Sequence, residues 1–227
     1  RWEDKSGNGN HATQGTAGSR PARKTAVQGG LDVLRFDGSD DGLSFASDID
    51  LSPTQSVFVV VKPASQITSA ASSQYILQGG TSPTAPSATS SQLLFAFGSI
   101  TGTATSETVG VYAVSVNTNN TSVGVFGHYS KTNVTAAATL LAYVSQGTDS
   151  DTFVGRRNDA EDFTNLTTSD QGHWRETNLQ YPTKVQRVGS AASGGYLDGD
   201  ICEIIIYNSA LSDTDREAVE NYLLAKW

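Results

Sequence analysis

The sequence predicts an all-β fold in which two antiparallel sheets form a sandwich and one helix ends the chain. Short runs rich in β-branched and aromatic residues recur at close intervals, separated by polar turns, which is typical of a β-sandwich. A convincing helical spacing of apolar residues occurs only near the C-terminus. A chain of 227 residues can bury a sizeable core within one all-β domain. We therefore expect residues 1–227 to form a single domain.

Composition narrows the classes of partner. The net charge of -8 argues against nucleic acid or an anionic membrane surface as the main partner. No apolar run approaches the ~20 residues that a membrane-spanning helix requires. The single cysteine, Cys202, excludes a disulfide within the chain, and its apolar context predicts a small buried hydrophobe. These features fit a soluble surface protein in contact with neutral glycans.

A turn-rich loop at residues 4–10 follows Trp2. Gly and Asn tolerate positive φ, and Asp and Asn side chains bond nearby backbone amides, which favours a structural loop that buries the tryptophan. The alternative is a metal site built from Asp4, Asn8 and Asn10. We favour the structural interpretation.

A second turn, at residues 37–42, carries three carboxylates between a strand predicted at 31–36 and one that begins at Leu43. We interpret it as a solvated hairpin turn. Ca²⁺ takes six to eight oxygen ligands, so Asp40 and Asp41 are candidate metal ligands, although their spacing is not that of an EF-hand loop.

The middle of the chain supplies most of the predicted strands. The polar segment 13–30 is interpreted as a surface excursion, and the apolar run 57–61 as a strand buried on both faces. Three runs, 109–116, 123–129 and 139–144, are expected to form an antiparallel meander. The full set of further strands is predicted at residues 56–63, 75–77, 93–97, 109–116, 123–129, 139–144, 152–156 and 184–188.

The C-terminal segment is a strand followed by the helix. Residues 201–207 are dense in isoleucine, which suits a pleated, largely buried surface. Ser212 is a good N-cap, and Asp213 and Asp215 lie near the positive end of the helix dipole. We expect the helix to dock on the body through one apolar stripe, which comprises Ala218, Val219, Tyr222, Leu223 and Trp227.

This C-terminal segment, GDICEIIIYNSALSDTDREAVENYLLAKW, resembles the final signature of LamG-like domains of the concanavalin A-like lectin/glucanase superfamily. WEDKSGNGNHATQ at the N-terminus, VLRFDGSDDGL and the strand SVFVVVKP match further family motifs in the expected order. The resemblance implies a jelly roll of two curved antiparallel sheets with one C-terminal helix. It also implies bacterial secreted or bacteriophage virion proteins as the source. Family members usually carry a further strand ahead of the first motif, so we expect the chain to be cut from something longer.

Catalytic motifs are sparse. The sequence has no HExxH zinc motif and no G-x-S-x-G elbow with supporting context, and it lacks the E-x-D-x-E strand of the related glucanases. Glu203 stands alone, with Ile201 and Ile205 expected on its face. A catalytic carboxylate with a raised pKa is one interpretation. We favour a structural carboxylate that pairs with an arginine or with backbone amides and locks the strand, and Arg35 and Arg156 are the candidate arginines.

Glycan binding is the better supported chemistry. Sugar sites combine an aromatic plate with planar polar groups, because a pyranose has an apolar face and a hydroxyl rim. Trp174 lies in a polar context and is the candidate plate, although it could equally pack on the sandwich edge. The candidate rim residues are Tyr129, Arg157, Asn158 and Asp162.

The leading hypothesis is therefore a non-catalytic carbohydrate-binding or adhesion module on a phage virion or a secreted bacterial protein. Its expected partners are a glycan or cell-surface polysaccharide and other virion or cell-surface proteins, and its expected location is extracellular or on the virion surface. The alternatives are a purely structural decoration domain of a larger assembly, and a polysaccharide lyase or glycoside hydrolase.

Overall fold

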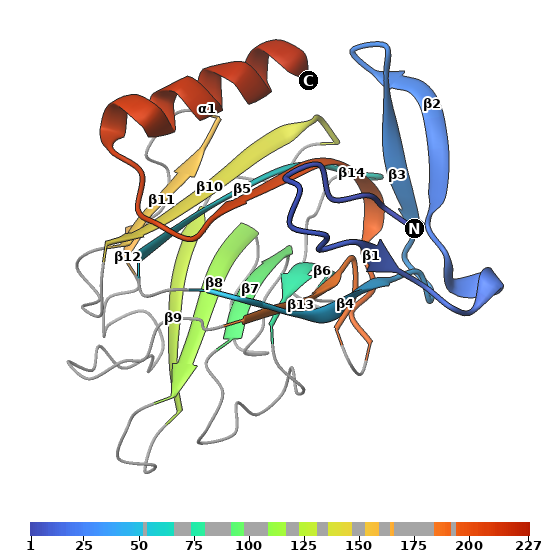
Figure 1. The fold of residues 1–227 in the computed structure, drawn as a ribbon, viewed down its shortest axis with the longest axis horizontal. Helices are drawn as coiled ribbons and strands as arrows, with labels where there is room; N and C mark the ends of the chain where they lie inside the picture. Colours follow the sequence, from blue (N-terminus) through green and yellow to red (C-terminus); the bar gives the residue numbers. More distant parts are fainter. Residues whose placement is uncertain are drawn as a thin grey trace.

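A computed structural model shows two antiparallel β-sheets stacked face to face, with one α-helix lying on the outside of one sheet (Figure 1). The structure describes residues 1–51, 54–65, 74–79, 92–97, 109–116, 123–130, 136–146, 153–158, 164–165, 184–191 and 194–227. No helix in these ranges has the length and apolar character needed to cross a membrane.

The first sheet has eight strands in the order β1-β4-β13-β6-β7-β8-β9-β12, all paired antiparallel. The strands predicted at residues 109–116 and 184–188 are confirmed in both bounds. In sheet order the strands are β1 Ala12–Thr13, β4 Leu43–Asp50, β13 Lys184–Val188, β6 Gln74–Gln78, β7 Gln92–Phe97, β8 Val109–Val116, β9 Val123–Ser130 and β12 Thr164–Asn165.

The second sheet has six strands in the order β11-β10-β5-β14-β3-β2. Its apolar centre is β5, where Val57, Phe58 and Val59 are fully buried, so the prediction of a strand covered on both faces is confirmed. In sheet order the strands are β11 Phe153–Arg157, β10 Thr139–Gln146, β5 Thr54–Pro63, β14 Asp198–Tyr207, β3 Leu31–Asp37 and β2 Ala22–Gln28.

The main core lies between the sheets, where side chains at alternate strand positions interdigitate. One close approach is set by Gly189, whose φ is +77°. A Cβ built at this position would lie 2.0 Å from Cε1 of Phe36, so only glycine fits. The largest fully buried members of this core are Phe36, Ile76, Leu77, Phe97, Leu141, Tyr143 and Leu197.

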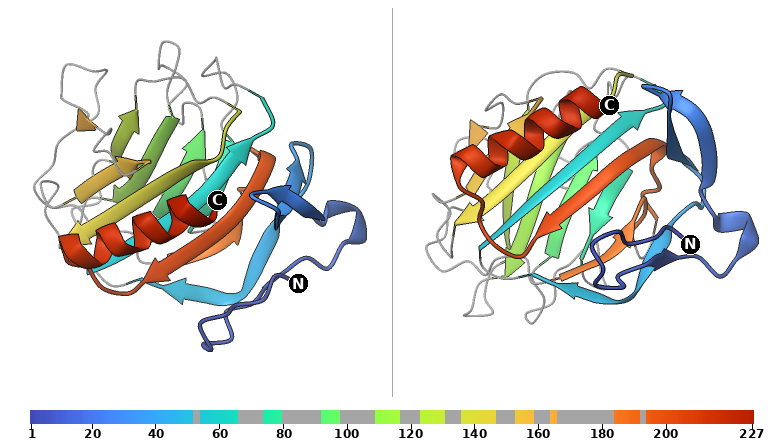
Figure 2. Two further views of the ribbon diagram at one scale, coloured as in Figure 1. Left: turned by 90° about the horizontal axis from the view of Figure 1, so that it is seen from above. Right: turned by 45° about the horizontal axis from the view of Figure 1, so that its top comes forward.

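A smaller core lies between the six-stranded sheet and helix α1 (Asp213–Lys226), which covers the outer face of that sheet (Figure 2). Ser212 caps the helix as predicted, and its Oγ accepts a hydrogen bond from the Asp215 backbone N–H at 3.2 Å. This second core is formed by Val33, Phe58, Val60, Leu140, Ala142, Cys202 and Leu223.

The predicted docking stripe of α1 is only partly correct. Leu223 is buried, but Tyr222 is 49% exposed, and Ala218 also faces solvent. The helix instead buries Arg216 and Glu220, one turn apart, whose side chains form an ion pair at 2.8 Å. Arg216 and Glu220 can both lie on the docked face because each neutralises the charge of the other. The spacing of apolar residues in the sequence does not reveal such a pair.

Residues 13–30 lie at the surface, as interpreted, but Ala22–Gln28 form the strand β2, which was not predicted, and a short 3₁₀ helix, η1 (Ala17–Ser19), precedes this strand. The strand lies at the end of the six-stranded sheet and pairs only with β3 among the described strands. Its first five side chains are exposed, so it needs no apolar alternation and gives no sequence signal of a buried face.

Two connections cross between the sheets where the sequence predicted local hairpins. The turn at residues 37–42 leads from β3 in one sheet to β4 in the other, so it is not a hairpin turn. Similarly, β8 and β9 pair with each other, but β10 pairs with β5 and β11 in the opposite sheet. The predicted three-strand meander is therefore wrong at its third strand, because adjacency in sequence does not fix which sheet a strand joins.

Candidate functional site

A polar cluster lies on the outer face of the eight-stranded sheet, where β4 and β13 run side by side. Ile49 and Val185 point into the inter-sheet core, so strand alternation turns Asp48, Lys184 and Gln186 outward. The Asp48 carboxylate accepts hydrogen bonds from Lys184 Nζ at 2.9 Å and from Gln186 Nε2 at 2.7 Å. The bond from Lys184 lowers the pKa of Asp48, so the carboxylate stays charged in neutral solution.

This cluster has the chemistry of a hydroxyl-recognising surface. A carboxylate, a carboxamide and an ammonium group offer both acceptors and donors in a fixed arrangement. The Lys184 and Asp48 side chains remain 44% and 32% exposed, which leaves them accessible to a ligand. These three residues were not predicted from the sequence. The alternation of acids with Ile49 in β4, opposite Lys184 in β13, is the signal that could have indicated a polar outer face.

The five predicted glycan residues are not brought together on one sheet. Tyr129 lies in β9 of the eight-stranded sheet, whereas Arg157 ends β11 of the six-stranded sheet. Asn158 follows β11 with a φ of +48°. Trp174 and Asp162 lie outside the described residues.

Asn158 has a structural task. Its Oδ1 accepts a hydrogen bond from the Leu140 N–H at 2.9 Å, and its own N–H donates to the Leu140 carbonyl at 3.0 Å. These two bonds close the end of the β10–β11 pair. Its amide oxygen is thus engaged by backbone, although the side chain lies at the surface.

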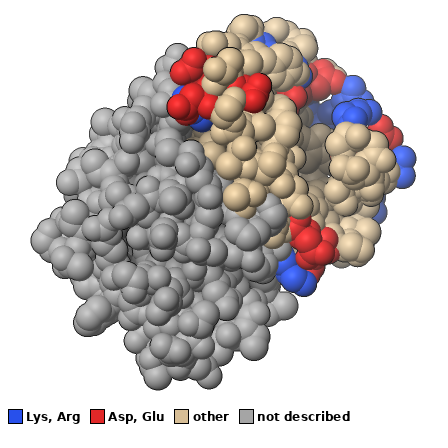
Figure 3. Space-filling view, turned by 60° about the vertical axis from the view of Figure 1, so that its left-hand side comes forward, with Lys and Arg blue, Asp and Glu red and all other residues tan. Residues whose placement is uncertain are grey.

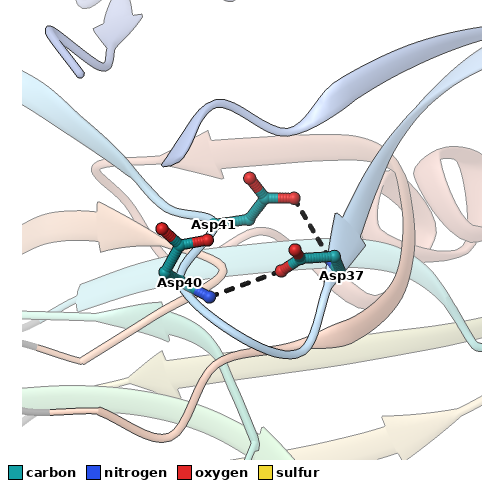
Figure 4. Close-up of side chains that lie close together, drawn as sticks. All are labelled: Asp37, Asp40 and Asp41. Atoms are coloured by element: carbon teal, nitrogen blue, oxygen red, sulfur yellow. Dashed lines mark hydrogen bonds between the residues drawn. The ribbon is translucent and has the colours of Figure 1, made fainter. Parts of the chain in front are cut away.

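The predicted acidic turn gathers three carboxylates, from Asp37, Asp40 and Asp41, within 4.8 Å of one another (Figure 4). Asp41 is only 5% exposed, and its Oδ2 accepts a hydrogen bond from the Asp37 N–H at 3.1 Å. The Asp37 carboxylate in turn accepts hydrogen bonds from backbone N–H groups, chiefly that of Ser39 at 2.9 Å. The turn therefore orders itself through side-chain to backbone bonds.

The pKa values of Asp41 and Asp37 shift in opposite directions. Burial raises the pKa of Asp41, and the nearby charges of Asp37 and Asp40 raise it further. By contrast, the Ser39 N–H lowers the pKa of Asp37. For Asp41 the folded state binds the proton more tightly than the unfolded state. Protonated Asp41 therefore contributes to the free energy of unfolding. This contribution is fully present below the pKa of Asp41 in the unfolded state and is lost as the pH rises through its pKa in the folded state.

We expect Asp41→Asn to raise the free energy of unfolding at neutral pH by on the order of 1 kcal/mol. The amide oxygen can still accept the Asp37 N–H bond, whereas the buried charge is gone. The gain should disappear as the pH falls to about 4, because the raised pKa of Asp41 means that its carboxyl in the original protein takes up a proton before the pH reaches the usual range of an aspartate. Urea denaturation of both proteins at about pH 4 and about pH 7 measures the effect. A variant that is less stable at pH 7 would contradict it.

Glu203 is a structural carboxylate. Its Oε2 accepts hydrogen bonds from Lys226 Nζ at 2.8 Å and from Trp227 Nε1 at 2.7 Å, and its Oε1 accepts one from Tyr222 Oη at 3.3 Å. The predicted Arg35 partner is wrong, because Arg35 is bound through two nitrogens to Asp200. Glu203 thus fastens β14 to the last turn of α1.

A β-bulge explains why the face of Glu203 was assigned incorrectly. The pairing of β14 with β5 shifts between Ile201 and Glu203, which inserts one residue. Ile201 therefore points into the inter-sheet core, while Cys202 and Glu203 both lie on the helix side together with Ile205. Strict alternation through the bulge would place Ile201 and Glu203 on one face.

Two further predictions are confirmed. Cys202 is 7% exposed in the core beneath α1, and burial raises the pKa of its thiol to about 12, so it is a packing residue. In the N-terminal loop the Asp4 carboxylate accepts backbone hydrogen bonds from Ser6 and Asn10, both at 2.8 Å. The His11 Nδ1 accepts the Asp4 N–H at 3.1 Å, so the loop is held by its own side chains.

No family model matches the sequence, and no curated protein matches it. Solved structures do share the fold. Domain 4 of AbnA, an extracellular GH43 arabinanase from Geobacillus stearothermophilus, is 15% identical, with a TM-score of 0.52 over 91% of this chain and 82% of that chain. An arabinofuranosidase is 12% identical, with a TM-score of 0.54 over 99% of this chain and 50% of that chain, so this chain spans about half of that enzyme. The protein thus has an all-β jelly-roll sandwich fold of two antiparallel sheets with one C-terminal helix.

Proposed function

We propose that the protein is a non-catalytic carbohydrate-binding module whose ligand lies on the outer face of the eight-stranded sheet. The observation that carries this proposal is the Asp48–Lys184–Gln186 cluster on that face. The outer face of the other sheet is covered by α1. A sugar on the cluster would exchange hydroxyl hydrogen bonds with groups that are already oriented.

The neighbouring folds support a neutral glycan as the ligand class. The arabinanase domain was solved with arabinotriose and the arabinofuranosidase with arabinofuranosyl-xylobiose. Tyr129 lies in the same sheet as the cluster, four strands away from β13, which is roughly 19 Å. We propose that Tyr129 extends the binding surface for a short oligosaccharide on this sheet. We propose Arg157 and Asn158, which belong to the other sheet, together with Trp174 and Asp162, as glycan contacts outside this face.

Binding rather than catalysis is the favoured activity, because the carboxylate singled out for catalysis is already engaged. Glu203 lies beside a lysine and an indole N–H on the helix side of the six-stranded sheet. Glycoside hydrolysis requires two carboxyl groups that flank one bond. We further propose that residues 1–227 are one LamG-like domain of a secreted bacterial or phage virion protein, with cell-surface polysaccharide as its partner.

We expect the protein to bind at least one neutral oligosaccharide, and Asp48→Ala to weaken that binding at least tenfold through the loss of a charge-assisted acceptor. A glycan array that includes arabino- and xylo-oligosaccharides identifies the ligand, and calorimetry measures its affinity for both proteins. Asp32→Ala is the matched control, because Asp32 forms an exposed ion pair with Arg23 on the other sheet. Unchanged affinity in Asp48→Ala, or new reducing ends after incubation, would contradict the proposal.

We propose that Asp40 and Asp41, with Asp37, provide a Ca²⁺ site at the β3–β4 crossing. A cation would offset the mutual repulsion that raises the pKa of Asp41. We expect Ca²⁺ to raise the melting temperature of the original protein and to leave that of Asp41→Asn nearly unchanged. Thermal melts with Ca²⁺ or with a chelator measure this difference. Equal shifts in both proteins would locate the ion elsewhere.

A further inference from the structure

One half of β14 has an open edge. The strand pairs with β5 from Gly199 to Tyr207, but it pairs with β3 only from Asp198 to Ile201. Beyond that point no strand in the described part of the chain bonds to the side of β14 that faces away from β5. Alternate residues of this half direct their N–H and C=O groups toward the open side.

The open edge is apolar on its inner side and belongs to the core. Ile204 and Ile206 pack against the inter-sheet cluster, yet both remain partly exposed. Their paired neighbours on β5, Val57 and Val59, are fully buried. The contrast indicates that apolar surface of Ile204 and Ile206 is left uncovered on the side of β14 that faces away from β5.

The open edge lies beside a projecting arm of the six-stranded sheet. The pairing of β14 with β3 ends at Leu34, and β3 rises with β2 as this arm (Figure 1). The space-filling view shows a hollow between the arm and the helix-covered body, with both basic and acidic side chains beside it (Figure 3). A single extended segment of six residues, roughly 20 Å long, would match the length of the unpaired half of β14.

The charges on the helix side of this region favour an acidic occupant. Arg35 is 47% exposed, while its partner Asp200 is 5% exposed. Lys226 is 32% exposed and its partner Glu203 is 22% exposed. Each pair is neutral as a whole, but in both the cation reaches further into solvent than the anion, so a docked strand would meet the Arg35 and Lys226 side chains before the carboxylates.

We propose that the open edge of β14, residues 202–207, is a docking site for an extended acidic segment of a separate protein, bound by β-strand addition. Backbone bonds to β14 supply the affinity. Alternate side chains of the segment supply the specificity. Apolar ones pack beside Ile204 and Ile206, and acidic ones face Arg35 and Lys226.

The test uses the 227-residue protein and four synthetic twelve-residue peptides: alternating Glu-Val, alternating Lys-Val, a scrambled Glu-Val sequence, and the alternating Glu-Val peptide methylated on every backbone nitrogen. We expect the first to bind at least tenfold more tightly than the other three. Bound peptide should slow amide hydrogen exchange at residues 202–207 at least tenfold, without slowing exchange in the exposed strand β2.

Each contrary outcome points to a different occupant or to none. Equal binding of the methylated peptide shows that backbone pairing is not used, and equal binding of the Lys-Val peptide shows that charge is not read. Exchange at residues 202–207 that is already slow without peptide shows that a segment of this chain covers the edge. Concentration-dependent protection without peptide shows that a second copy does so. Any of these results overturns the proposal.

Discussion

Gly189→Ala should be strongly destabilising, with a loss of about 3–5 kcal/mol of stability. The φ of +77° penalises any Cβ, and the added methyl carbon would lie 2.0 Å from a ring carbon of Phe36. The backbone cannot retreat easily, because the Gly189 N–H donates to Ile76 O and its carbonyl accepts from Leu197 N–H, both at 2.9 Å. A loss of this size is a large part of typical total stability. Urea denaturation measures it.

Gly18→Ala is the matched control, because a Cβ at this position meets no atom within 4 Å. We expect this control to melt within about 2 °C of the original protein. The double variant Gly189→Ala with Phe36→Leu should recover part of the loss if the ring contact is the cause. A Gly189→Ala protein of unchanged stability would show that the close contact between the Gly189 backbone and the Phe36 ring does not require glycine.

Glu203→Ala should release the end of α1 from the sheet and cost about 2 kcal/mol, or roughly 4–8 °C in Tm. The carboxylate accepts bonds from Lys226 and Trp227 at 2.7–2.8 Å, and its removal leaves a half-buried indole N–H without its acceptor. Glu203→Gln should lose about half as much, because the amide oxygen can still accept one of these bonds. Thermal and urea denaturation of the three proteins give the comparison.

Glu217→Ala serves as the control for Glu203→Ala. The same change is made in helix α1 instead of strand β14, at a side chain that is 62% exposed. We expect an effect below about 0.5 kcal/mol there. If the two variants were equally stable, the hydrogen bonds of Glu203 to Lys226 and Trp227 would not stabilise the docking of α1 on β14.

Local pattern was enough to find most of the strands and the helix, because each depends on residues close in sequence. The apolar run of β5 and the Ser212 cap are examples, since a buried strand and a helix start have their own composition. Which sheet a strand joins depends on contacts far along the chain, and for this reason β10 was misplaced. The edge strand β2 was missed because its exposed side chains carry no periodic signal.

The candidate site was predictable to a smaller degree. The acidic turn was identified because its carboxylates are neighbours in sequence. Asp48 and Lys184 are 136 residues apart and meet only through the pairing of β4 with β13, so no local pattern joins them. The position of Glu203 depends on the one residue that the bulge inserts into β14. Because of this residue, Glu203 lies on the opposite face of the sheet from Ile201, whereas strict alternation would place both on the same face.

Because Cys202 is buried beneath α1, the reactivity of its thiol can be used to measure how often the helix separates from the sheet. A thiol-specific reagent can react only while the helix is lifted, so the modification rate counts opening events. Since this is the sole sulfhydryl, every labelled molecule marks the same event, and no engineered probe is needed to time it.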